Sequence, residues 1–91
     1  MDPKEIQQKV IKILAENLNI DPKNITCQSK LVEDLGVDSF SAIEIMFEIE
    51  DEFKININED EIVSIKTVEE IVKNIINKIK IISHYKNLIN S

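Results

Sequence analysis

The chain has 91 residues, of which 43% are apolar and 31% charged, and its formal net charge at pH 7 is −6. This length predicts a single small domain whose thin core has no room for a large enclosed active site. The negative charge disfavours nucleic-acid binding. The single cysteine, Cys27, excludes an internal disulfide and a cysteine-based zinc site. No apolar run approaches the roughly 20 residues that span a bilayer.

The charge is unevenly distributed along the chain. All eleven basic residues are lysines, and four of them, but none of the 17 acids, lie between Ile71 and Ser91. The first 70 residues therefore carry seven lysines against 17 acids, a net charge of −10. A domain with such a field attracts basic protein surfaces. The N-terminus is charged and unlike a signal peptide, so we expect a cytoplasmic monomer that meets basic protein partners and binds no metal.

The first predicted element is a helix that begins near Asp2 and ends near Asn19. Asp2 is placed to cap it, Pro3 suits its first position, and Glu5 stands where a capping-box acid belongs. The apolar residues that follow at helical spacing are Ile6, Val10, Ile13, Leu14 and then Asn17 or Leu18. This pattern predicts one buried face.

A long connection follows, from Ile20 to Asp38. A segment of this length in a compact domain has to be held in place by side chains or serve a function. Its candidate anchors are Ile20, Ile25, Leu31 and Leu35.

The second predicted helix runs from Asp38 or Ser39 to Phe53 and carries two apolar stripes. The core stripe consists of Ala42, Ile45, Met46, Ile49 and Phe53. The second stripe consists of Phe40, Ile43 and Phe47. Because a surface helix of a small domain needs only one apolar face, the second stripe points to a contact with another molecule.

Two further helices complete the chain. Residues 54–58 alternate in polarity but have no partner strand, so we read them as an extended loop; a short helix then begins at Asn58 and ends near Ser64, with Ile62 and either Val63 or Ile65 facing inward. Thr67 and Glu70 form a capping-box pattern at the start of the last helix. Its apolar positions are Val68, Ile71, Val72, Ile75, Ile76, Ile79 and Ile82. The predicted fold is an all-α four-helix bundle with a long first loop and a short third helix.

The residues offer almost no catalytic chemistry. Gly36 is the only glycine, so no glycine-rich phosphate loop exists, and His84 is the only histidine. Cys27 has no nearby histidine in the sequence and is interpreted as a small, partly buried thiol. The charge run 48–52 reads as a solvated helix face and lacks the ligand spacing of a calcium loop. We therefore expect a protein that is not an enzyme.

One segment, residues 31–40, combines several unusual features. Gly36 permits a tight turn, Asp38 can cap the second helix, and Ser39 would then present its hydroxyl from the first helical turn. A phosphate attached to Ser39 would lie at the positive end of the helix dipole. The second apolar stripe begins beside this hydroxyl, and the acids Glu44, Glu48 and Asp51 run alongside it. From these residues alone, the pair Asp38–Ser39 is either an ordinary helix cap or a site of modification.

The segment resembles the modification-site motif of acyl carrier proteins, in which Leu-x-x-Asp-Leu-Gly-x-Asp-Ser precedes the second helix. The matching residues are Leu31, Asp34, Leu35, Gly36, Asp38 and Ser39. The likeness continues through the acidic second helix and the entry to the last one, and covers about residues 3 to 80. The domain would then comprise residues 1–80, with residues 81–91 as an extension of the last helix or a tail.

The resemblance implies that Ser39 carries 4′-phosphopantetheine, with Asp38 as the second residue of the cofactor site, and that a phosphopantetheinyl transferase delivers the group from coenzyme A. The arm would hold acyl groups as thioesters and present them to enzymes of fatty-acid or polyketide-type synthesis. The residues implied to meet the basic patches of these partners are Asp38, Phe40, Ile43, Glu44, Phe47, Glu48 and Asp51. Those implied to line a shelter for the acyl chain are Ile49, Phe53, Ile62 and Ile65, whose other interpretation is ordinary core.

Two positions depart from the common fatty-acid type. Phe40 stands where leucine is usual, which leaves the identity of the transferase and the synthase open, and Ser41 stands where an acid is frequent. Two other functions remain. One is an aminoacyl or D-alanyl carrier with the same prosthetic group; the other is an unmodified, acidic helical adaptor, which would keep its function after Ser39→Ala.

Overall fold

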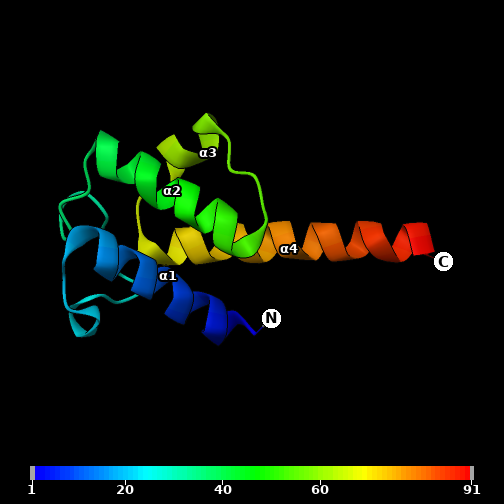
Figure 1. The fold of residues 1–91 in the computed structure, drawn as a ribbon, viewed down its shortest axis with the longest axis horizontal. Helices are drawn as coiled ribbons and strands as arrows, with labels where there is room; N and C mark the ends of the chain where they lie inside the picture. Colours follow the sequence, from blue (N-terminus) through cyan, green and yellow to red (C-terminus); the bar gives the residue numbers. More distant parts are fainter. Residues whose placement is uncertain (1, 91) are drawn as a thin grey trace.

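A computed structural model describes the backbone of residues 2–90 and the side chains up to residue 81. Expectations about the side chains of Ile82 and His84 therefore lie outside the described residues. The elements in chain order are α1 (Pro3–Leu18), the 3-10 turn η1 (Pro22–Asn24), α2 (Ser39–Phe53), α3 (Glu59–Ser64) and α4 (Val68–Asn90). Figure 1 shows α1, α2 and α3 arranged around the first half of α4, whose second half continues past them. The predicted all-α, four-helix architecture is confirmed.

The ends of the helices follow from local side-chain chemistry. The Asp2 carboxylate accepts a hydrogen bond from the Lys4 amide (3.0 Å) and caps α1. Asn58 caps α3 by accepting from the Glu61 amide (2.9 Å). Thr67 accepts from the Glu70 amide, as the sequence pattern predicts for the start of α4. Each of these caps satisfies a backbone donor that the helix itself leaves unpaired.

The long connection between α1 and α2 is held both by apolar side chains and by the start of α4. Leu31 donates its amide to the Lys66 carbonyl (2.9 Å), while the amides of Val68 and Glu69 donate to the carbonyls of Ser29 (3.2 Å) and Cys27 (2.9 Å). These bonds pair backbone groups that a loop of this length would otherwise leave to water. Of the predicted anchors, Ile25, Leu31 and Leu35 are buried and Ile20 is half-buried.

The core lies between α1, α2 and α4. Its fully buried large side chains are Ile6, Val10 and Leu14 from α1, Ile45 and Ile49 from α2, and Val68, Ile71 and Ile75 from α4. Lys54 ends α2 in a left-handed conformation, so the predicted extended loop is shorter than expected. Residues 55–58 form no helix or strand, and Ile55 and Ile57 are buried in this core. The Glu50 carboxylate fixes that segment by accepting a hydrogen bond from the Ile57 amide (2.8 Å). Among the described residues, no helix is long and apolar enough to cross a membrane.

Candidate functional site

Ser39 is the first residue of α2 and is exposed to solvent. A reciprocal capping box holds the turn around it: Asp38 Oδ1 accepts from the Ser41 amide (2.8 Å), and Ser41 Oγ accepts from the Asp38 amide (3.0 Å). The hydrogen bonds from Ser41 also hold the pKa of the Asp38 carboxyl below its usual value. In the family that the sequence resembles, an acid is frequent at position 41. Here the Ser41 hydroxyl makes the second hydrogen bond of the capping box instead.

The loop before Ser39 has a fixed shape. Gly36 adopts a φ of +72°, a left-handed conformation that is costly for residues with a Cβ atom. The Asp34 carboxylate accepts from the Lys30 amide (2.8 Å), and the Val37 amide donates to the Leu31 carbonyl (2.9 Å). These contacts explain why the motif needs an acid, a glycine and apolar anchors at these spacings, since they bring the chain to the start of α2 in one orientation.

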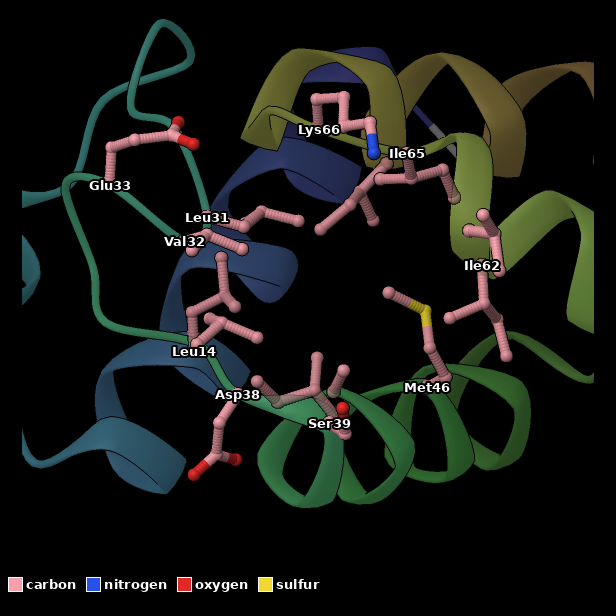
Figure 2. A pocket seen from close by; sticks show the side chains of 15 residues that line it. Leu14, Leu31, Val32, Glu33, Asp38, Ser39, Met46, Ile62, Ile65 and Lys66 are labelled. Carbon is pink, nitrogen blue, oxygen red and sulfur yellow. The ribbon is translucent and has the colours of Figure 1, made fainter.

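An apolar cavity of about 490 Å³ opens beside Ser39. Figure 2 shows labelled side chains on its walls: Leu14 from α1, Leu31 from the long loop, Ser39 and Met46 from α2, and Ile62 and Ile65 from α3 and the segment after it. The full lining is Leu14, Leu31, Val32, Glu33, Val37, Asp38, Ser39, Ala42, Ile45, Met46, Ile62, Val63, Ile65, Lys66 and Ile71.

The structure separates the four residues expected to line an acyl shelter. Ile62 and Ile65 line the cavity, whereas Ile49 and Phe53 do not. They lie further along α2, where both are buried in the core. Ala42 and Met46 line the cavity instead, one and two helical turns beyond Ser39. Both residues follow Ser39 at helical spacing, so the sequence alone could have predicted that they lie on the same face of α2 as Ser39.

The residues expected to contact partners lie on the exposed part of α2. Phe40, Ile43 and Phe47 are 73%, 50% and 65% exposed, which is unusual for large apolar side chains. The acids Glu44, Glu48 and Asp51, together with Asp38 before the helix, are also exposed.

Of the three acids within α2, Glu48 and Asp51 have partners in the chain. Glu48 accepts a hydrogen bond from the Asn17 side chain on α1 (2.9 Å), and Asp51 lies 3.8 Å from the Lys54 ammonium. Glu44 has no ion-pair partner in the part of the chain that the structure describes. Within that same part, no cluster of three or more histidine, cysteine or acidic side chains is arranged to hold a metal ion.

Comparisons with known proteins establish the family of the chain. The family model described as "Phosphopantetheine attachment site" matches residues 8–75. The acyl carrier protein of Rickettsia massiliae (strain Mtu5) is 46% identical over 69 residues, which cover 76% of this chain and 80% of the relative. The acyl carrier protein of Rickettsia bellii (strain RML369-C) is 46% identical over 67 residues, covering 74% and 78%.

A solved structure of the acyl carrier protein from Enterococcus faecalis is similar in fold as well. It superposes with a TM-score of 0.73 at 35% sequence identity and covers 86% of this chain and 99% of its own. On the family match, the curated relatives and this shared four-helix fold, the chain belongs to the acyl carrier proteins, which are carriers rather than enzymes and hold a phosphopantetheine group.

Proposed function

We propose that Ser39 carries the 4′-phosphopantetheine arm, and that the chain delivers acyl groups, held as thioesters on that arm, to enzymes of fatty-acid or polyketide-type synthesis. The observation that carries the proposal is the position of Ser39, an exposed first residue of α2 at the edge of an apolar cavity. A phosphopantetheinyl transferase has to reach the serine hydroxyl, and the exposed first turn of a helix permits that approach.

The surroundings of Ser39 fit a group joined through a phosphodiester. Ser39 begins α2, and the positive end of a helix dipole would stabilise a phosphate joined there. Asp38 directs its carboxylate to the Ser41 amide at 2.8 Å, so its charge is engaged in capping the helix. We assign to Asp38 the positioning of Ser39 and a contact with partner proteins. When bound, the arm supplies a terminal thiol that forms thioesters with acyl groups.

The cavity provides a shelter for an acyl chain. Its volume of about 490 Å³ falls within the range of small-molecule pockets, roughly 300–1,000 Å³. Its walls are mainly apolar, so a hydrocarbon chain that enters it leaves water at a gain of about 25 cal/mol per Å² buried. We assign the acyl contacts to Ile62, Ile65 and Met46, and not to Ile49 and Phe53, which lie outside the lining.

The exposed side of α2 is the docking surface of this proposal. Its apolar part comprises Phe40, Ile43 and Phe47, and its acidic part comprises Asp38, Glu44, Glu48 and Asp51. A partner with a basic patch around an apolar centre matches this arrangement. Glu44 offers its whole charge to such a partner, whereas Glu48 must share its carboxylate with Asn17.

The nature of the cavity also supports an acyl cargo over an aminoacyl one. An amino acid on the arm carries an ammonium group, which an apolar cavity binds poorly. Parallel loading assays, with acyl and aminoacyl ligases acting on the modified chain, separate the two cargoes directly.

Intact mass spectrometry tests the attachment site. The purified chain is incubated with coenzyme A, magnesium and a broad-specificity phosphopantetheinyl transferase, beside Ser39→Ala and Ser41→Ala controls. We expect a gain of one phosphopantetheinyl group in the parent and in Ser41→Ala, and none in Ser39→Ala. Modification of Ser39→Ala would place the arm elsewhere. An unmodified parent with several transferases would instead favour the adaptor, in which Ser39 only begins the helix.

A further inference from the structure

The helix α3 is the least anchored wall of the cavity. The helices α1, α2 and α4 each bury four side chains in the described part of the chain, whereas α3 buries none. Ile62 is half-buried and Val63 is 71% exposed, so the apolar attachment of α3 depends on Ile62 and on the residues that flank the helix. Elements with few buried contacts open at a lower free energy than the rest of a domain.

A group of polar side chains joins α3 to α4, and we call it the α3–α4 polar cluster: Glu61, Asn74 and Lys78. The Lys78 ammonium lies 2.8 Å from Glu61 Oε2 and 2.9 Å from Oε1, and Asn74 Nδ2 donates to Glu61 Oε2 at 3.0 Å. The paired side chains of Lys78 and Glu61 are 23% and 25% exposed, against 42% to 89% in the other three ion pairs of the described chain. Water competes less with a pair that is partly buried, so this pair contributes more than the exposed ones.

The same cluster contains a polar atom that has no hydrogen-bond partner while α3 packs against α4. Asn74 Oδ1 is buried and has no hydrogen-bond partner in the described chain. An unpaired buried acceptor costs free energy, and water would reach it once α3 moved away from α4. The packing of α3 against α4 is therefore opposed by the unpaired Asn74 Oδ1 and favoured by the contacts that Glu61 makes with Asn74 Nδ2 and with Lys78, so Glu61 is the residue that determines the balance.

The cluster and the cavity wall are neighbours in the chain. Glu61 reaches α4, and the next residue, Ile62, lines the cavity; Figure 2 shows Ile62 and Met46 on the same side of the cavity, from α3 and α2 respectively. On α4, Ile71 lines the cavity, and Asn74 and Lys78 follow one and two turns later. Any movement that takes α3 away from both α2 and α4 therefore has to break the cluster as it widens the cavity.

We propose that the α3–α4 polar cluster holds α3 against α4 and thereby limits the size of the cavity, so that its opening determines how long an acyl chain the carrier shelters. This inference rests on the proposed function, because it takes the cavity as the acyl shelter. It makes Glu61 and Lys78 residues that set the cargo length without touching the cargo.

Amide hydrogen exchange on the unmodified protein tests the hold on α3 without any acyl group. The reporters are the Ile62 and Ile65 amides, which donate to the carbonyls of Asn58 and Glu61. We expect Glu61→Gln to raise their exchange rates about fivefold, the ratio that corresponds to roughly 1 kcal/mol. Glu52→Gln is the matched control, since it makes the same charge change in the Lys9–Glu52 pair between α1 and α2. Equal α3 exchange in the two variants overturns the proposal.

A series of acyl groups of increasing length tests the effect on the cargo. Each acyl group is attached to the protein by loading it from the corresponding acyl-coenzyme A. A sheltered chain binds only the folded state and raises the unfolding temperature, until further carbons no longer fit. We expect this limit to move to longer chains in Glu61→Gln, and to return toward the parent value in the charge-swapped variant Glu61→Lys/Lys78→Glu.

The possible failures are distinguishable. If α3 exchanges faster in Glu61→Gln but the length limit stays at the parent value, the link between the cluster and the cargo is refuted. If no acyl chain of any length stabilises the parent, the sheltering function itself is refuted, while the exchange data still decide whether the cluster holds α3.

Discussion

Replacing Gly36 by alanine is expected to destabilise the fold by about 1 kcal/mol through backbone strain alone. Gly36 has a φ of +72°, and no heavy atom lies within 4 Å of the position that a Cβ atom would take. The left-handed conformation costs alanine roughly 1–2 kcal/mol, and the smaller entropy of the unfolded chain returns about 0.4–1 kcal/mol of this. For a domain of this size, the difference lowers the unfolding temperature by about 4–8 °C.

Urea unfolding followed by circular dichroism measures this difference, with Gly36→Asn and Lys54→Gly as companions. Asparagine tolerates the left-handed region better than alanine, so Gly36→Asn should lie between the parent and Gly36→Ala. Lys54 has a φ of +55° at the end of α2, and its pair with Asp51 at 3.8 Å is exposed and weak. Lys54→Gly should therefore raise stability. A Gly36→Ala chain with the parent's midpoint, or a shift of the same sign in Gly36→Ala and Lys54→Gly, would refute the reasoning.

Four further outcomes are expected. Ile71→Ala, at a fully buried position beside the cavity, should lower the free energy of unfolding by about 2–5 kcal/mol in urea titrations, and a loss below that of Gly36→Ala would contradict its place in the core. Ser41→Ala should cost about 0.5–1 kcal/mol of thermal stability, whereas Ser41→Glu should retain the capping box and lose little. Lys78 holds the pKa of the Glu61 carboxyl below its usual value, so the ionised carboxylate stabilises the fold at pH values above its ordinary pKa, and this stabilisation is lost as the pH falls through the lowered pKa. The difference in unfolding free energy between the parent and Glu61→Gln should therefore be largest at neutral pH and shrink in acid. A difference that stays constant with pH would exclude the charged pair as its source. Because the first 70 residues carry seven lysines against 17 acids, added salt or magnesium should raise the unfolding temperature, and an unchanged melting curve would argue against self-repulsion.

The helices could be read from the sequence because their signals are local. Asp2, Asn58 and Thr67 cap helices where their patterns place them, and the core stripe of α2 is buried as its spacing predicts, except at Ala42, which is half-buried. The backbone bonds that fasten the first loop to the start of α4 leave no trace in side-chain chemistry, so the sequence could only indicate that the loop had to be held.

The cavity lining was harder to predict, for a physical reason. One apolar stripe of α2 serves both the core and the cavity, and helical spacing does not reveal which part of the stripe meets a neighbouring helix. Met46 is buried and also lines the cavity, while Phe53, on the same stripe, is buried in the core outside the cavity, because the cavity extends from the first half of α2 to Ile62 and Val63 of α3, an arrangement that only the fold determines. The role of Glu61 in joining two helices was likewise invisible, since its partner on α4 is 17 residues away.

The long α4 has a practical consequence for how this carrier can be handled. The molecule measures 45 × 25 × 19 Å, and its long dimension follows α4, with the start of α2 toward one end and the last turn of α4 at the other (Figure 1). A dye, an affinity tag or a bead attached at the last turn of α4 is thus kept at the opposite end of the molecule from Ser39. Immobilising the chain through that end leaves the serine and the exposed side of α2 pointing into solution, ready for enzymes to be passed over it.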